Sequence, residues 1–401
     1  VWEPALERAR EELAEMEKMF KEDYTDSEYK FESWDWWYYA EKVRQKKYAL
    51  NEDIIRGYFS LDNTRQGIFN LANRLFGITF RPVTVPVYHK DVSAYEVLDK
   101  DESHLGILYF DFHPRAGKGQ GAWCGYYREQ RYEADGTRTA PVVSIVCNFT
   151  APTEATPSLL TLDEVTTLFH EFGHALHFLF TNVRYNGLIN VEGDFVELPS
   201  QIMENWALTP QMLRTYATHY RTGEVIRDQY ISRIENSALF NQGFNTVELI
   251  AAALSDMDIH STTDYSEIDV DGFEYNALYT KRGMLTQIEP RYHYTYFAHI
   301  FSGGYTRAEG LDKDAFEAFR ETGDIFDRRT ADALRREILS KGGSNDGMSL
   351  YKAFRGKAPD KSAMLKARGL WKEPEVVESE EEAPKSATIR EMLNAKVNKL
   401  K

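Results

Sequence analysis

The segment spanning residues 161–180 constrains the fold more than any other stretch of this sequence, because both its start and its periodicity predict a helix. Thr161 and Glu164 have the spacing of a capping box, in which each side chain bonds the other residue's backbone N–H. The apolar residues that follow return at helical intervals and form a wide face: Leu162, Val165, Leu168, Phe169, Phe172, Leu176 and Leu179. The chain therefore contains a helix with a large apolar surface to bury.

Two histidines interrupt this apolar helix one turn apart. At positions i and i+4, His170 and His174 project from the same face and can share one tetrahedral zinc ion. Glu171 completes the motif HExxH and points a carboxylate toward a water on such a metal. Either histidine alone is more simply interpreted as a hydrogen-bonded residue of a helix core. The pair favours a metal, which satisfies two polar groups that are costly to bury unpaired.

A third ligand is expected downstream, because zinc sites with two histidines commonly take a carboxylate from a following helix. Three candidates follow His174 at intervals of 18, 23 and 30 residues: Glu192, Glu197 and Glu204. Residues 194–206 are expected to form a helix with Glu197 and Glu204 on one face. Glu197 is the predicted ligand. Glu192 lies in a glycine-flanked loop, and Glu204 is expected to orient a histidine or simply to pack.

The charge balance and the hydropathy pattern limit the partners of the chain. Its 48 basic and 63 acidic residues give a net charge of −15, which disfavours a large basic face for nucleic acid. No apolar run approaches the roughly 18 residues of a membrane span. The two cysteines, Cys124 and Cys147, form no CxxC pair, so the fold is not expected to depend on disulfides. We expect a globular protein with neither nucleic-acid nor membrane partners.

The remaining sequence predicts a mainly α protein with a small β-sheet. Charged or aromatic-rich runs predict early helices at residues 7–21, 34–43 and 61–76, and alternation predicts strands at residues 83–88 and 105–112. Asp135-Gly136 predicts a hairpin that joins residues 121–131 to residues 141–149. From residue 157 to residue 370 nearly everything is expected to be helical, with breaks at residues 185–193, 261–272 and 302–310.

The composition changes sharply after Trp371. Residues 373–385 contain six glutamates and two prolines and are predicted to be an acidic linker. Residues 386–401 then place apolar side chains at helical spacing, which is typical of a short amphipathic helix. A solvated tail with weak helicity is the alternative. The expected organisation is therefore a domain at residues 1–372, a linker and a short terminal helix.

Several other stretches have unusual local sequences: WDWWYYAE at 34–41, YHKDV at 88–92, GAW at 121–123, FNQGF at 240–244 and PRYHYTYFAHIFSGGY at 290–305. Together with HEFGHALH around His170 and DFVELPSQ around Glu197, they resemble the thimet oligopeptidase and peptidyl-dipeptidase Dcp family of zinc peptidases. The resemblance runs from about residue 2 to residue 370 and is greatest to the Dcp branch. It implies a zincin-type catalytic domain that hydrolyses short peptides and releases C-terminal dipeptides.

The resemblance also implies a set of site residues. One zinc ion per chain is expected on His170, His174 and Glu197, with Glu171 as general base. The oxyanion donors that it implies are His299 and Tyr305. Because an edge strand of a zincin pairs with an extended substrate, the hairpin is expected to clamp the peptide through Gly121, Ala122, Trp123 and Asn148. An ordinary sheet edge is the alternative for this hairpin.

Two departures from the family pattern leave other functions open. The family's full chain carries an N-terminal helical region that the resemblance does not cover, so a half-enzyme that needs a separately supplied N-terminal portion is one alternative. After Tyr305 the family has a tyrosine cluster, whereas this chain has Thr306 to Gly310, so a metal-binding domain with impaired catalysis is another. The first residues, Val-Trp-Glu-Pro, show no leader pattern. A cytoplasmic location is expected, or a periplasmic one if a leader was removed.

Overall fold

The computed structural model describes residues 1–372, apart from residues 26–27, 50, 267 and 303–310. Contacts divide the chain into a unit at residues 1–370 and a second unit at residues 371–401. All described helices and strands belong to the first unit. The predicted acidic linker and terminal helix lie outside the described residues and stay predictions. No helix in the described ranges combines the length and the apolar character that crossing a membrane requires.

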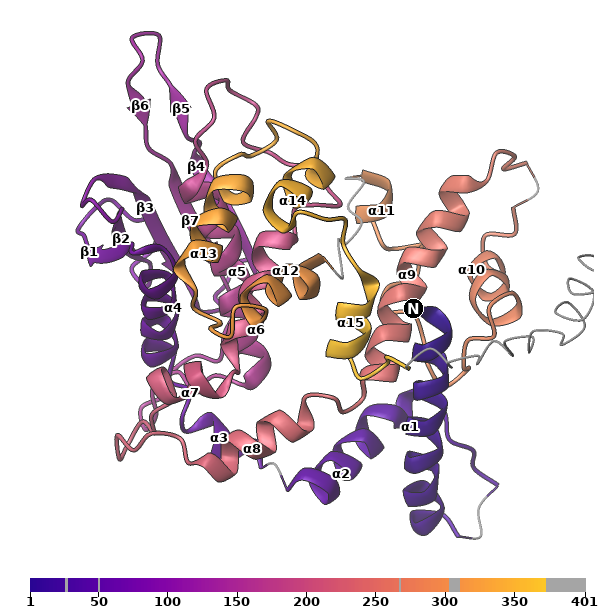
Figure 1. The fold of residues 1–401 in the computed structure, drawn as a ribbon. Coiled ribbons are helices and arrows are strands. Elements are labelled where there is room, and N and C mark those ends of the chain that lie inside the picture. Colours follow the sequence, from indigo (N-terminus) through magenta and orange to yellow (C-terminus); the bar gives the residue numbers. More distant parts are fainter. Residues whose placement is uncertain (26–27, 50, 267, 303–310, 373–401) are drawn as a thin grey trace, which may run out of the picture. The chain divides into compact units, whose positions relative to one another are not determined.

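Helices make up most of the first unit (Figure 1). Those before the sheet are α1 Trp2–Asp23, α2 Trp36–Tyr48, α3 Glu52–Arg56 and α4 Leu61–Phe76, with a 3-10 turn η1 at Ser33–Asp35. Those after it are α5 Leu162–Phe180, α6 Leu198–Ala207, α7 Pro210–Tyr216, α8 Asp228–Ser237, α9 Gln242–Ser261, α10 Phe273–Tyr275, α11 His299–Ser302, α12 Leu311–Arg320, α13 Arg328–Leu334, α14 Gly347–Arg355 and α15 Lys361–Ala367. Two π-helical turns, η2 Asn276–Thr280 and η3 Arg335–Leu339, continue α10 and α13.

A five-stranded sheet with the order β1-β2-β3-β7-β4 accompanies these helices. Its strands are β1 Thr79–Pro82, β2 Ser93–Leu98, β3 His104–Asp111, β4 Trp123–Arg128 and β7 Val142–Val146. All neighbours are antiparallel except β3 and β7, and β4 is an edge strand. Beyond it, β5 Arg131–Tyr132 pairs with β6 Arg138–Thr139 around a turn at Gly136, whose φ is 85°. The mainly α architecture with a small sheet, and the hairpin, are therefore confirmed.

Parts of the secondary-structure prediction are wrong. Residues 83–88 form no strand, because the ladder ends at Val83 and Pro86 has no N–H to donate. The unpredicted strand β2 pairs with β1 instead. Residues 281–298, expected to be helical, form turns that include Gly283 with a φ of 65° and Pro290.

Helix α5 lies at the centre of the core. It contacts β3, β4 and β7 and packs most extensively on α6. The approach to α6 is so close that a Cβ atom added at Gly173 would lie 2.1 Å from the carbonyl oxygen of Pro199. Only glycine allows this backbone contact. The buried side chains Phe169 and Phe172 of α5 and Trp206 of α6 belong to the same apolar core.

Candidate metal centre

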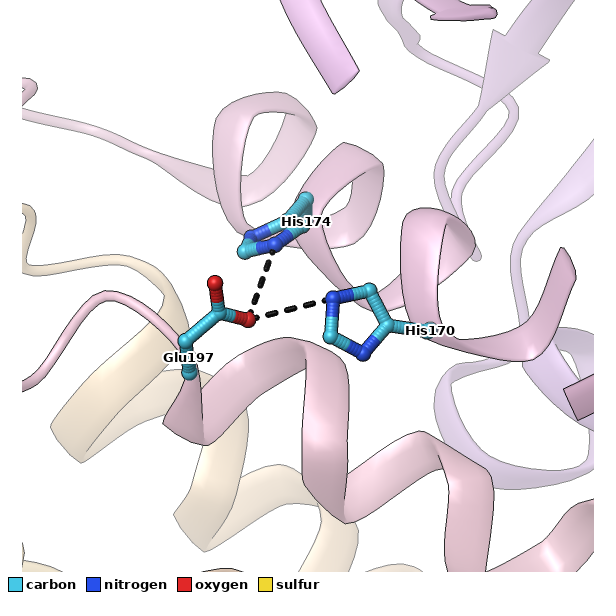
Figure 2. A group of neighbouring side chains, drawn as sticks. All are labelled: His170, His174 and Glu197. Carbon is cyan, nitrogen blue, oxygen red and sulfur yellow. Dashed lines mark ion pairs between the residues drawn. The ribbon is translucent and has the colours of Figure 1, made fainter. Parts of the chain in front are cut away.

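Three side chains from α5 and α6 converge at one point (Figure 2). His170 and His174 lie on α5, whose Thr161–Glu164 capping box forms as predicted. Glu197 is the residue before α6. Oε2 of Glu197 lies 3.1 Å from Nε2 of His170 and 3.2 Å from Nε2 of His174, and all three ligand atoms are within 4.8 Å of one another. The structure thus brings together the three predicted ligands.

The start of α6 differs from the sequence prediction. Residues 193–197 form a turn, and the helix begins at Leu198 rather than at Asp194. Pro199 occupies the first helical turn, where its missing N–H costs nothing. Glu197 therefore acts as the N-cap residue, and its side chain is directed to α5.

The donor set fits a zinc ion. Ligand bonds of about 2.0–2.1 Å in a tetrahedron place neighbouring donor atoms roughly 3.3 Å apart. The two distances from Glu197 to the histidines are close to this edge length. Two imidazole nitrogens and one carboxylate oxygen are also ligands that zinc prefers, and they leave a fourth position for water or substrate.

Neighbouring polar groups form hydrogen bonds with two of the three candidate ligands. Nδ1 of His170 donates to Oε1 of Glu204 at 2.6 Å, which directs the other ring nitrogen to the shared point. The hydroxyl of Ser200 donates to Oε2 of Glu197 at 2.6 Å. Glu192 lies elsewhere, because its carboxylate accepts a hydrogen bond from the backbone N–H of Gly347 at 2.9 Å. The three candidate carboxylates therefore make different contacts: Glu197 with both histidines, Glu204 with His170 and Glu192 with the backbone of Gly347.

The electrostatics of the cluster follow from these contacts. Burial disfavours the charged form of His170, but hydrogen bonds to Glu197 and Glu204 outweigh it and raise its pKa to about 10. Burial likewise opposes ionisation of Glu197, yet the two histidines hold its pKa well below the usual range. At neutral pH the site is thus a carboxylate paired with a protonated His170, and a bound cation would take the place of that proton.

Glu171 is buried beside the ligands. Only 5% of its surface is exposed, and its Oε2 atom has no hydrogen-bond partner among the described residues. Burial raises the pKa of Glu171. Burying a carboxylate oxygen without a hydrogen-bond partner costs free energy of folding. Stability alone therefore does not explain why a glutamate occupies this position.

A cleft of about 1220 Å³ borders this cluster. Its walls include the three metal-binding candidates, Glu171, Glu204, Ala122, Trp123 and His299. Gly121 and Asn148, which were also expected to bind substrate, are not among its lining residues. Asn148 instead donates to the carbonyl oxygens of Gly119 and Gly121 at 2.8 Å each, and so holds the loop that enters β4. Tyr305 lies outside the described residues.

A buried charge cluster supports the same loop. Asp111, at the end of β3, accepts hydrogen bonds from Arg115, Lys118 and the hydroxyl of Tyr88. Lys118 also donates to the carbonyl oxygen of Cys147. The cluster therefore ties the ends of β3 and β7 to the loop before the edge strand.

Several basic and aromatic residues of the cleft were not singled out from the sequence. They are Arg291, Tyr292, Tyr296, Lys313 and Arg368. Lys313 donates to Oδ1 of Asn205 at 2.8 Å. The basic and aromatic run after Pro290 can be seen in the sequence. The sequence does not show that this run lines the same cleft as Lys313 and Arg368, because these residues are distant from it along the chain.

Two histidines of an HExxH helix, a carboxylate from the next helix and a glutamate beside them are typical of metallopeptidases. The family model described as Peptidase family M3 matches residues 2–370. The chain belongs to this family of metallopeptidases.

Individual relatives agree with this assignment. The chain is 41% identical over 378 residues to "Dipeptidyl carboxypeptidase" of Escherichia coli (strain K12), which covers 91% of this chain and 55% of the relative. It is 34% identical over 382 residues to "Oligopeptidase A" of the same organism, again covering 91% and 55%. It is 35% identical to "Organellar oligopeptidase A, chloroplastic/mitochondrial" of Arabidopsis thaliana, covering 84% and 45%. The chain therefore spans about half the length of these relatives.

Proposed function

We propose that the chain is the zinc-binding catalytic portion of a peptidase that hydrolyses short oligopeptides and releases dipeptides from their C-termini. The observation that carries this proposal is the convergence of His170, His174 and Glu197 on one point in the wall of a large cleft. The membership of Peptidase family M3 and the name of the 41% identical relative, Dipeptidyl carboxypeptidase, support the reaction class. The proposed fold of the catalytic part is that of a zincin.

The side chains around the ligands account for the chemistry. His170, His174 and Glu197 would hold a zinc ion, which would supply a Lewis acid for a water and the scissile carbonyl. Glu171 takes a proton from the attacking water at its unpartnered Oε2 atom and delivers it to the leaving amine. His299, which lines the cleft, donates to the oxygen that becomes negative as the carbonyl is attacked. Tyr305 is proposed as the second donor.

The edge strand holds the substrate in this proposal. Among the described strands β4 pairs only with β7, and Trp123 at its start lines the cleft together with Ala122. An extended peptide can add to such an edge as a further strand, which places its backbone along the cleft. Gly121 and Asn148 act indirectly, because they fix the loop that precedes the strand.

The test is product analysis of short peptides by mass spectrometry, with the zinc-loaded protein, after removal of zinc by a chelator, and after zinc is restored. We expect C-terminal dipeptides in the first and third samples only. Hydrolysis that survives complete metal removal would overturn the proposal.

A second candidate is a metal-binding domain with little turnover of its own. It is favoured by the sequence after Gly304, which departs from the resembled family. Adding the N-terminal portion of the Escherichia coli relative in trans separates the cases. Restored turnover indicates a half-enzyme, and bound zinc without turnover in either sample indicates a silent domain.

A further inference from the structure

Ser200, in the first turn of α6, places its hydroxyl beside the candidate metal ligand Glu197. The serine is fully buried. Its Oγ atom lies 2.6 Å from Oε2 of the Glu197 side chain and 2.8 Å from the backbone carbonyl oxygen of the same residue. A hydroxyl has one proton to donate, so only one of these two oxygens can receive a full hydrogen bond.

The carboxylate is the stronger of the two acceptors. The carbonyl oxygen of Glu197 already accepts a hydrogen bond from the backbone N–H of Gln201 at 2.9 Å. A carboxylate that binds a metal is ionised, and hydrogen bonds to ionised oxygens are shorter and about twice as strong as neutral ones. The distance of 2.6 Å from Ser200 falls in the range of such bonds. The hydroxyl proton is therefore directed to Oε2.

The same oxygen faces both histidines. Oε2 of Glu197 lies 3.1 Å from Nε2 of His170 and 3.2 Å from Nε2 of His174, whereas the other carboxylate oxygen is directed away from the two rings (Figure 2). Each carboxylate oxygen has two lone pairs. The hydrogen bond from Ser200 occupies one lone pair of Oε2 and leaves the second for a metal ion between the rings.

The position of this hydroxyl is fixed by the contact between α5 and α6. A Cβ atom added at Gly173 would lie 2.6 Å from Cα of Ser200, so the two backbones touch at this residue. Gly173 lies between His170 and His174 along α5. Ser200 is therefore held at a constant distance from both rings, and a donor on such rigid elements can fix the orientation of the group it bonds.

We propose that Ser200 is a positioning residue for the metal, whose hydroxyl holds Glu197 so that Oε2 alone coordinates the ion. This inference rests on the proposed zinc-dependent function and adds a residue that the set of three ligands does not include. Without the hydroxyl, the carboxylate can rotate and bring its second oxygen to the ion. The expected consequences are weaker binding and occupation of the position that water or substrate requires.

Zinc affinity tests the hydrogen bond. Ser200→Ala should weaken zinc binding at least about tenfold, as loss of a partner of a metal ligand does, in competition with a chelator of known affinity. Ser237→Ala is the matched control, because the hydroxyl of Ser237 donates to the carbonyl oxygen of Ile234, three residues earlier in its helix, at 2.9 Å. This variant should leave the affinity unaltered. A loss of less than about twofold in Ser200→Ala would show that its hydroxyl only bonds the helix backbone, and would overturn the inference.

The visible absorption of the cobalt(II)-substituted protein tests the number of coordinating oxygens. Cobalt(II) with four ligands absorbs more strongly than cobalt(II) with five or six, so the spectrum reports the coordination geometry. Ser200→Ala should absorb more weakly than the unmodified chain, because the second oxygen of Glu197 joins the metal. Ser237→Ala should have an unchanged spectrum. Weaker binding in Ser200→Ala with an unchanged cobalt spectrum would overturn the coordination through Oε2 alone.

Neither measurement depends on peptide hydrolysis, so this inference and the peptidase proposal fail separately. A chain that binds zinc but hydrolyses no peptide would overturn the peptidase function, and the two measurements would still decide the role of Ser200. Unaltered affinity in Ser200→Ala would overturn that role and leave the peptidase function standing. An unmodified chain that binds no zinc would overturn both.

Discussion

Glu204 accepts a hydrogen bond from Nδ1 of His170 at 2.6 Å, which turns Nε2 of that ring toward Glu197. The contact joins α6 to α5 six residues beyond the start of α6, and Glu204 lines the cleft. A carboxylate in this position fixes the tautomer and the orientation of a metal ligand, and it increases the basicity of the imidazole.

Glu204→Gln is expected to weaken zinc binding about 10- to 100-fold without abolishing it, because the ligand stays in place but loses its charged partner. Competition with a chelator of known affinity measures the change. Glu192→Gln is the matched control, since that carboxylate bonds the backbone of Gly347 and should leave zinc affinity unaltered. Equal affinity in Glu204→Gln and the unmodified chain would contradict an orienting role.

Zinc content identifies the ligands. His174→Ala should abolish retention of the metal and Glu197→Ala should lower it strongly, because each removes one of three donors around the same point. Glu192→Ala should retain about one zinc per chain. Elemental analysis after dialysis against metal-free buffer gives the stoichiometry. Full zinc in Glu197→Ala, together with loss in Glu192→Ala, would show that the ligand assignment is wrong.

Glu171→Gln separates proton transfer from metal binding. The substitution keeps the shape of a buried side chain but removes the group that accepts a proton. Turnover should fall by about three orders of magnitude or more, while zinc content stays near one per chain. Steady-state kinetics and elemental analysis on one preparation provide both values. Loss of zinc in this variant would mean that Glu171 is itself a ligand.

Gly173→Ala is expected to destabilise the protein, because its Cβ atom would meet the carbonyl oxygen of Pro199 at 2.1 Å. Moving α5 and α6 apart to admit the methyl group costs at least about 1–3 kcal/mol and also displaces Glu197 from the histidines. The free energy of unfolding, measured in urea, and the zinc affinity should therefore both decrease. Gly125→Ala, where an added Cβ has no neighbour within 4 Å, is the control and should change stability little.

Asp111 predicts a pH dependence of stability. Burial by itself raises the pKa of this carboxyl, but hydrogen bonds from Arg115, Lys118 and Tyr88 outweigh it and hold the pKa well below the usual range. A depressed pKa in the folded state contributes stability above the unfolded value of about 3.9, and this stability is lost as the pH falls toward the folded value.

Asp111→Asn should therefore lower the free energy of unfolding by about 3 kcal/mol at pH 7, as breaking a buried ion pair does. The difference from the unmodified chain should shrink progressively below about pH 4. Urea unfolding at a series of pH values measures it, with the exposed Asp332→Asn as control. A difference that is constant with pH would assign the loss to packing rather than to the charge.

Local sequence was sufficient to predict the elements whose signals lie within a few residues. The helix that carries His170 and His174 starts at its capping box, and the hairpin turns at Gly136, because the interactions that fix them are near neighbours in the chain. The histidine spacing likewise predicts that both rings share a face, since this follows from the helical period alone.

Only the tertiary structure decided features that depend on distant segments. The pairing of β1 with β2 replaced the predicted strand at residues 83–88, since strand pairing is determined by the partner as much as by propensity. The position of Glu197 depends on the close approach of α5 and α6 at Gly173. Spacing along the chain limits which residues can meet, but the packing of the core selects which of them do.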